Sequence, residues 1–168
     1  MQKAKPIIID IMKRLNPISV LDLGCGKCKF SKRFIDKGID VTGVDKNKLV
    51  SSFGNFNFFH QDVLSFKFKK KYDLIIGTGI LHFLKKESSC RLIKEIQLNT
   101  NLGGFNFLIC MSNKEDDKKN DYFYPSINDL EEIYKNWEII HNTNCLSKKH
   151  DEDSHQHKII IFLARKVK

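Results

Sequence analysis

Two carboxylates and a pair of glycines near the start of the chain have the types and the spacing of a nucleotide-like ligand site. An apolar run reaches Asp22, the turn that follows contains Gly24 and Gly26, and Asp45 comes nineteen residues after the second glycine. Glycines let the backbone approach a ligand where a side chain would block it. Asp45 ends a predicted strand, where its carboxylate can accept hydrogen bonds from both hydroxyls of a ribose. The pattern therefore predicts an adenosyl ligand.

The remainder of the glycine loop distinguishes among adenosyl cofactors. A dinucleotide fingerprint has a third glycine that seats a pyrophosphate on the helix, and Lys29 stands at that position. The phosphate-binding pattern that ends in Gly-Lys-Ser or Gly-Lys-Thr is absent from the chain. Asp22 suits a cationic ligand with a sulfonium and an amine. We therefore predict a site for S-adenosylmethionine; the alternative is a structural strand-turn-helix without a ligand.

The predicted cofactor-binding residues lie in the glycine loop or at the ends of predicted strands. Gly24 and Gly26 would pass beside the methionine portion, and Asp22 would anchor its amine directly or through water. Asp62 would accept a hydrogen bond from the exocyclic amine of adenine, beside the backbone N–H of Val63. The alternative role of Asp62 is a turn or helix-capping aspartate. The full predicted set is Asp22, Gly24, Cys25, Gly26, Asp45, Lys46, Asp62, Val63 and Thr78.

A metal site is not predicted. Cys25 and Cys28 have the Cys-x-x-Cys spacing, but both lie in the predicted cofactor loop and no second pair completes four ligands. His150, His155 and His157 stand near acidic residues, and we interpret them as surface histidines.

Length, composition and charge restrict the class of protein. A chain of 168 residues fits one α/β domain and leaves no room for a separate substrate domain. We expect no membrane span and no export signal, and the five irregularly spaced cysteines favour a reducing cytoplasm. The formal net charge of +9 makes RNA a partner to consider. The lysines are scattered in pairs and triplets, however, which favours a solvated surface.

Hydrophobic periodicity and glycine stops predict an alternating order of helices and strands. We expect a lead-in helix that covers the sheet edge, a cofactor half at 18–84 and a substrate-side half at 85–168. Polar residues 112–125 would form a mobile loop whose aromatic side chains cap the ligand. The predicted helices span 3–15, 27–37, 46–52, 86–99 and 126–134, and the predicted strands span 18–23, 39–45, 56–60, 72–77, 105–111, 137–141 and 157–164.

Several segments carry a family resemblance over nearly the whole chain. They are 20–26, 44–47, 72–76 with 83–84, 99–106, 129–138 and 163–166. On these residues the chain resembles class I methyltransferases and, within them, the tellurite-resistance methyltransferase (TehB-like) family. The glycine loop is shared by the whole superfamily, whereas Thr100-x-x-Gly103-Gly104 and Tyr134-x-x-Trp137 are more restrictive.

The resemblance implies a Rossmann-like sheet of seven mostly parallel strands with a carboxyl-terminal antiparallel hairpin. It also implies methyl transfer from S-adenosylmethionine to a small soft nucleophile, such as tellurite, selenite or a thiol, with S-adenosylhomocysteine as product. An anionic acceptor of this kind needs no base, so the protein mainly aligns the reactants and excludes water. The sequence departs from the family at Cys28, the usual third glycine of the loop, and lacks the spaced arginines before the last strand. His150 corresponds to the family histidine there and is a candidate catalytic residue.

His82 is the other candidate for a catalytic role. It follows the predicted strand at 72–77, where class I enzymes commonly place substrate-facing or cofactor-covering groups. We regard it as the best candidate for a general base. The alternative is a histidine that packs under the adenosyl group and moves no proton.

Two other functions remain open. An RNA-modifying methyltransferase would combine the same donor site with the basic surface and bind RNA in a salt-sensitive way. The absence of an Asn/Asp-Pro-Pro-Tyr/Phe segment after residues 72–77 argues against methylation of base amino groups. A noncatalytic module would bind the cofactor and contact another protein through residues 112–125.

Overall fold

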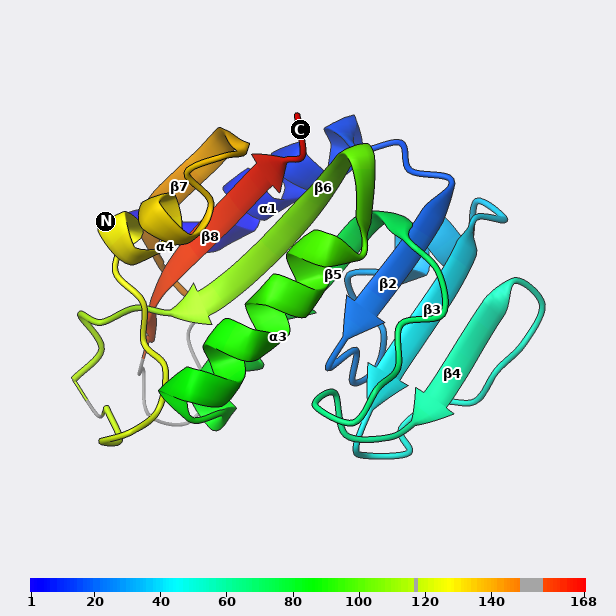
Figure 1. The fold of residues 1–168 in the computed structure, drawn as a ribbon, viewed down its shortest axis with the longest axis horizontal. Helices are drawn as coiled ribbons and strands as arrows, with labels where there is room; N and C mark the ends of the chain where they lie inside the picture. Colours follow the sequence, from blue (N-terminus) through cyan, green and yellow to red (C-terminus); the bar gives the residue numbers. More distant parts are fainter. Residues whose placement is uncertain (117, 149–155) are drawn as a thin grey trace.

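The computed structural model describes residues 1–116, 118–148 and 156–168. Helices and loops connect the strands of a single sheet (Figure 1). In chain order the elements are β1 (Gln2–Lys3), α1 (Ala4–Arg14), β2 (Ser19–Leu23), α2 (Lys32–Ile35), β3 (Asp40–Asp45), β4 (Phe56–His60), β5 (Tyr72–Thr78), the 3-10 helix η1 (Leu81–Phe83), α3 (Lys86–Leu98), β6 (Thr100–Met111), α4 (Ile127–Ile133), β7 (Glu138–Leu146) and β8 (Lys158–Arg165).

One sheet of eight strands has the order β1-β7-β8-β6-β5-β2-β3-β4. All neighbouring strands are parallel except β8, which runs antiparallel to both β6 and β7. The predicted α/β class and its antiparallel carboxyl-terminal pair are therefore confirmed. The eighth strand was not predicted, because Gln2–Lys3 is too short to give a pattern and becomes a strand only by pairing with β7.

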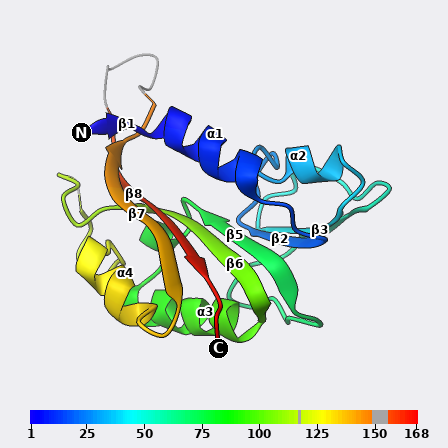
Figure 2. The same cartoon turned by 90° about the horizontal axis from the view of Figure 1, so that it is seen from above.

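The helices cover both faces of the sheet. Figure 2 shows α1 and α2 on one face and α3 and α4 on the other. Consecutive strand residues point to opposite faces, so Val20 joins the core under α1 and α2, and Leu21 joins the core under α3. Helix α1 lies across the sheet face, where Ile11 and Met12 are buried, and not along the sheet edge as expected.

Two predicted helices differ from the structure. The helix expected at 27–37 is reduced to α2, because Gly26 and Cys28 have φ angles of 52° and 57°, which an α-helix does not allow. The helix expected at 46–52 is a loop. Near the start of this segment, the N–H of Asn47 donates to Oδ1 of Asp45 at 2.8 Å. This local hydrogen bond to a side chain competes with helix formation.

Two predicted strands are longer than expected. Strand β7 runs to Leu146 because it pairs with β8 along its length. Strand β6 begins at Thr100, before Gly103 and Gly104 and not at residue 105 as predicted, and its pairing with β5 shifts register there. A Cβ on Gly104 would lie 2.9 Å from the carbonyl oxygens of Asn101 and Asp73, so this glycine permits close backbone packing inside the strand.

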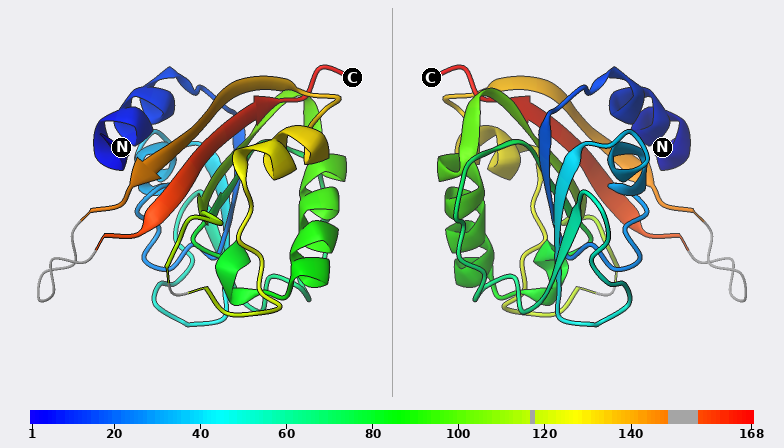
Figure 3. Two further views of the ribbon diagram at one scale, coloured as in Figure 1. Left: turned by 90° about the vertical axis from the view of Figure 1, so that its left-hand side faces the viewer. Right: turned by 90° about the vertical axis from the view of Figure 1, so that its right-hand side faces the viewer.

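The loops that follow the parallel strands gather at one edge of the sheet. Figure 3 shows the loops after β3, β5 and β6 together at the lower edge of the molecule. The strand order reverses between β2 and β5, and in open α/β sheets ligands bind beside such a switch point. Within the described residues, no helix has the length and apolar character needed to cross a membrane.

Candidate active site

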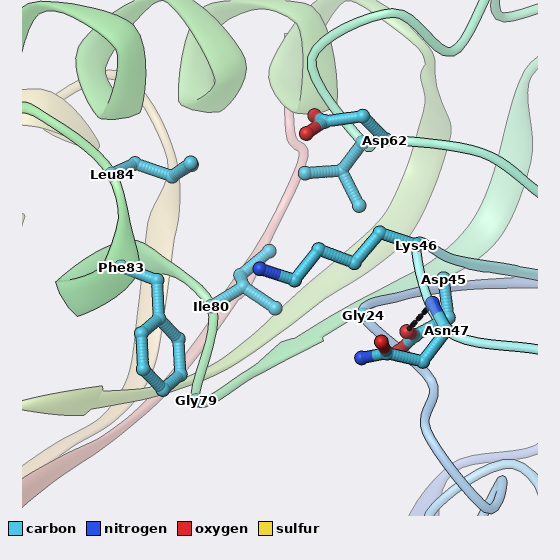
Figure 4. A pocket seen from close by; sticks show the side chains of 10 residues that line it. Gly24, Asp45, Lys46, Asn47, Asp62, Gly79, Ile80, Phe83 and Leu84 are labelled. Carbon is cyan, nitrogen blue, oxygen red and sulfur yellow. Dashed lines mark hydrogen bonds between the residues drawn. The ribbon is translucent and has the colours of Figure 1, made fainter. Parts of the chain in front are cut away.

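A cavity of about 260 Å³ lies at the carboxyl ends of β2, β3, β4 and β5 (Figure 4). Its walls contain five residues of the predicted cofactor set: Gly24, Asp45, Lys46, Asp62 and Val63. Five further wall residues were not predicted: Asn47, Gly79, Ile80, Phe83 and Leu84. Most of the latter are apolar residues after β5, where the sequence gives no polar signal for a ligand. These residues could have been predicted only from their position directly after a buried strand, because ligands bind at the carboxyl ends of such strands.

The glycine loop packs tightly against the segment after β5. Gly24 has a φ of 69°, and a Cβ there would overlap Cγ2 of Ile80. The N–H of Gly24 donates to the carbonyl of Val44 at 2.8 Å, and the N–H of Gly26 donates to Oδ2 of Asp45 at 2.8 Å. The loop is therefore fixed to the end of β3, and glycine is required at position 24 by both φ and space.

Asp45 is the polar centre of the cavity wall. It is buried at the end of β3, and its two oxygens accept hydrogen bonds from the N–H groups of Gly26 and Asn47. A carboxylate has about four lone-pair sites. Asp45 thus keeps acceptor capacity toward the cavity, as the predicted contact with two ribose hydroxyls requires.

Asp22 is buried beside Asp45 but does not line the cavity. Its Oδ2 accepts a hydrogen bond from Oγ of Ser31 at 2.7 Å, while its Oδ1 is buried without a partner. Burial raises the pKa of Asp22 to about 7, the hydrogen bond from Ser31 opposes the shift, and the charge of Asp45 adds to it. A buried carboxylate oxygen without a donor is costly. The residues therefore fit a ligand that brings a cationic donor, such as the amine of S-adenosylmethionine.

The position of Asp62 is compatible with both predicted roles, the contact with adenine and the turn aspartate. It lines the cavity, and its Oδ1 also accepts a hydrogen bond from the N–H of Leu64 at 2.8 Å, as a turn aspartate does. The side chain of Lys46 extends across the cavity toward Ile80 (Figure 4).

Cys25, Gly26 and Thr78 do not line the cavity. Cys25 is buried, and contact with Cys28 together with burial raises the pKa of its thiol. Cys28, which stands where the family usually has a third glycine, has a φ of 57°, so the structure places a side chain in the left-handed region. Among the described residues, no group of three or more histidine, cysteine or acidic side chains is arranged to hold a metal.

His82 lies in η1, next to the cavity. Its ring packs on Phe83 with centroids 4.1 Å apart and lies 6.5 Å from the ring of Tyr124. A Cβ on the wall residue Gly79 would lie 3.8 Å from Cε1 of His82. Burial lowers the pKa of His82 to about 4, and the charge of His157 contributes further. At neutral pH the ring is therefore uncharged and a weak base. His150 lies outside the described residues.

The segment 112–125, apart from residue 117, is tied to the body of the protein at several points. The N–H of Phe123 donates to the carbonyl of Leu84, and the N–H of Asn113 donates to the carbonyl of Pro125. Phe123 is buried in the core under α3, whereas Tyr124 is the aromatic residue that approaches His82. Of the predicted capping aromatics, Tyr124 is thus the one beside the site.

The strand order, the glycine loop and the cavity at the switch point define the α/β fold of class I methyltransferases. The sequence profile of the family described as tellurite resistance protein TehB matches residues 1–165. The chain belongs to this family.

Known proteins similar to this chain agree with that assignment. A probable S-adenosyl-L-methionine-dependent methyltransferase TehB of Haemophilus influenzae (strain 10810) is 29% identical over 174 residues, covering 95% of this chain and 61% of that protein. The crystal structure of TehB from Haemophilus influenzae matches with a TM-score of 0.81 and 28% identity over 96% of this chain and 62% of that one. The chain therefore spans about three fifths of the length of these relatives.

A more distant structure has the same fold. The N-methyltransferase NodS from Bradyrhizobium japonicum WM9, solved in complex with S-adenosyl-L-homocysteine, matches with a TM-score of 0.77 at 12% identity. The match covers 97% of this chain and 85% of that one.

Proposed function

We propose that this chain transfers a methyl group from S-adenosylmethionine to a small soft nucleophile of the tellurite, selenite or thiol type. The observation that carries the proposal is the unpartnered Oδ1 of Asp22, buried beside the loop that a methionine portion would cross. When bound, S-adenosylmethionine supplies a methyl group on a positively charged sulfur. The family match and the names of the relatives support this choice of donor.

The chain contributes binding and orientation at the donor side. Asp22 would accept from the amine, and Asp45 would accept from the ribose hydroxyls. Asp62 and the backbone of Val63 would bind adenine. Because Ile80 and its neighbours form an apolar wall, they would exclude water from the reacting atoms.

The acceptor side favours a small molecule. The cavity is small, and the described residues form one sheet. His150 and His82 are the candidate catalytic residues from the sequence, and the low pKa of His82 favours the packing role for that ring over the role of a base. The five free cysteines support a reducing cytoplasm as the place of the reaction.

The test is production of S-adenosylhomocysteine from S-adenosylmethionine with tellurite, selenite, a small thiol and bulk RNA as parallel acceptors. Turnover with an oxyanion or the thiol supports the proposal. Turnover with RNA alone would overturn the acceptor class. Calorimetric binding of S-adenosylhomocysteine without turnover of any acceptor would favour a noncatalytic module.

A further inference from the structure

Two cysteine side chains lie against each other in the glycine loop. Cys25 stands between the cavity residue Gly24 and Gly26, whose N–H donates to Oδ2 of Asp45. Cys28 follows at the Cys-x-x-Cys spacing, and the two thiols form a hydrogen bond. Both cysteines are free thiols in this structure. The loop that a methionine portion would cross therefore carries two neighbouring sulfur atoms that can be oxidised.

The backbone brings the two cysteines within the range of a disulfide. The N–H of Cys28 donates to the carbonyl of Cys25 at 2.7 Å and closes a turn of four residues. Such a turn places its first and last Cα atoms less than roughly 7 Å apart. Disulfides join cysteines whose Cα atoms are roughly 4.4–6.8 Å apart. A bond between the two sulfur atoms therefore requires only local movement of the loop.

The backbone at Cys28 favours glycine. Its φ of 57° lies in the left-handed region, where a residue with a side chain is uncommon. Backbone strain of this kind occurs most often at functional sites, where the surrounding structure compensates for it. The thiol at this position is therefore the feature that needs an explanation, and its contact with Cys25 supplies one.

The contact makes Cys28 the more reactive thiol of the pair. The hydrogen bond with Cys25 lowers the pKa of the Cys28 thiol, although burial acts in the opposite direction. The same hydrogen bond, together with burial, raises the pKa of Cys25. At the isolated Cys110, by contrast, burial raises the pKa of the thiol to about 12. Because the thiolate is the form that reacts with oxidants, Cys28 is suited to react first and Cys25 to react with the product.

We propose that Cys25 and Cys28 are a site of reversible oxidation, at which a peroxide converts the two thiols to a disulfide and thereby weakens binding of S-adenosylmethionine. The inference rests on the donor assigned under the proposed function and does not depend on the acceptor. The two thiols are 7% and 5% exposed, which restricts the oxidant to a small molecule such as hydrogen peroxide.

The oxidation proceeds in two displacements. The thiolate of Cys28 attacks one oxygen of hydrogen peroxide, and the O–O bond breaks with its electron pair on the other oxygen. The hydroxide that leaves takes up the proton that the thiol had released and becomes water. The sulfur of Cys25 then attacks the sulfenic acid on Cys28, loses its proton and expels a second water. The pair of thiols loses two electrons, and a small dithiol returns them by thiol–disulfide exchange.

The disulfide would change the part of the loop that meets the donor. In the reduced protein, Sγ of Cys25 lies 3.0 Å from the position of a Cβ on Gly43 of β3. Formation of the bond shortens the distance between the two sulfur atoms, so this close packing must change. The backbone passes the movement to Gly24 in the cavity wall and to Gly26, which fixes Asp45. By linkage, a donor that prefers the reduced loop also opposes its oxidation.

The experiment measures the disulfide and the donor site separately. After treatment with hydrogen peroxide, mass spectrometry of alkylated peptides should place one disulfide between Cys25 and Cys28. Calorimetry should then show that the oxidised protein binds S-adenosylhomocysteine roughly tenfold more weakly than the reduced protein. Dithiothreitol should restore the affinity. In a buffer of reduced and oxidised dithiothreitol, saturating S-adenosylhomocysteine should raise the ratio of reduced to oxidised protein by the same factor.

Two variants provide matched controls. Cys28→Gly removes one sulfur atom, and glycine adopts the φ of this position without strain. Its affinity for S-adenosylhomocysteine should lie within about threefold of reduced wild type and should not respond to peroxide. Cys90→Ser changes a half-buried cysteine on α3 and should keep the full response of wild type.

Three results would overturn the inference. They are alkylation of both thiols after peroxide treatment, a disulfide that leaves the affinity unchanged, and an equal loss of affinity in Cys28→Gly. If the reduced wild type fails to bind S-adenosylhomocysteine, the donor assignment of the proposed function is wrong. That failure is distinguishable, because the disulfide between Cys25 and Cys28 would still form and be detected by mass.

Discussion

The end of β3 and the junction of β6 with β8 are built in different ways. At the end of β3, backbone N–H groups make the contacts: those of Gly26 and Asn47 donate to the carboxylate of Asp45. At the junction of β6 with β8, Glu115 and His157 come together only because the two strands pair. The first arrangement therefore depends on the backbone of the glycine loop and of the residues after β3, whereas the second depends on the pairing of two remote strands.

The two segments that are most specific to the family begin at Thr100 and Tyr134, in the half of the chain at 85–168. Both of these residues have a structural role there. The hydroxyl of Tyr134 donates to Oδ1 of Asn106 at 3.0 Å, and Nδ2 of Asn106 donates to Oγ1 of Thr100 at 2.7 Å. Oγ1 of Thr100 donates in turn to the carbonyl of Ile96 at 2.7 Å, and all of these groups are buried. This network ties the carboxyl-terminal cap of α4 to β6 and α3.

The largest effect should come from Asp22→Asn on the donor side. The pKa of Asp22 is about 7 in the folded protein against 3.8 ordinarily. The protonated carboxyl of Asp22 therefore makes its full contribution to the free energy of unfolding below pH 3.8. This contribution is lost as the pH rises through 7. At pH 8, Asn should raise the free energy of unfolding of the ligand-free protein by at most about 4 kcal/mol.

Urea unfolding of both proteins from pH 4 to 8 measures this effect, and parallel stability curves would refute it. In wild type, affinity for S-adenosylhomocysteine should rise roughly eightfold from pH 6 to 7.5 as Asp22 ionises. The variant should bind weakly and without this rise.

Asp45→Ala should lower the affinity for S-adenosylhomocysteine by roughly 100-fold, because it removes the proposed contacts to the ribose and the acceptor of the Gly26 and Asn47 N–H groups. Calorimetry measures the affinity. Asp40→Ala is the matched control at the other end of β3, where the carboxylate pairs with Lys70 on the surface. Affinity within threefold of wild type in Asp45→Ala would show that the cofactor map is wrong.

Tyr134→Phe tests the buried hydrogen-bond network that joins Tyr134, Asn106 and Thr100. Loss of the hydroxyl leaves Oδ1 of Asn106 without its donor, so the free energy of unfolding should fall by about 1–3 kcal/mol. Donor affinity should stay within twofold, since the network does not touch the cavity. Tyr122→Phe, at an exposed position, is the control; a change in donor affinity without a change in stability would contradict the structural role.

The smallest effect should come from Tyr124→Ala. If Tyr124 caps the acceptor beside His82, removal of its ring should raise the KM of the acceptor roughly threefold and leave donor affinity unchanged. Tyr122→Ala serves as the comparison in the same segment. An unchanged KM would exclude the cap, and weaker donor binding would place Tyr124 on the donor side.

The sequence by itself determined the donor half of the protein: the order of its strands, the glycine loop and the positions of Asp22 and Asp45. These features depend on neighbouring residues, through strand periodicity, positive φ angles and backbone N–H groups that reach a side chain two residues away. Local reasoning failed where a distant contact overrides it, as in the extra residues of β6 and β7. It also missed two local features, the hydrogen bond from Asn47 to Asp45 that replaces a helix at 46–52 and the positive φ of Cys28 that shortens α2. Only the tertiary structure decided that Tyr134 belongs to a buried network, that burial makes His82 a weak base, and that Glu115 meets His157. Burial and partnership depend on which remote segments pack together, and no spacing along the chain encodes them.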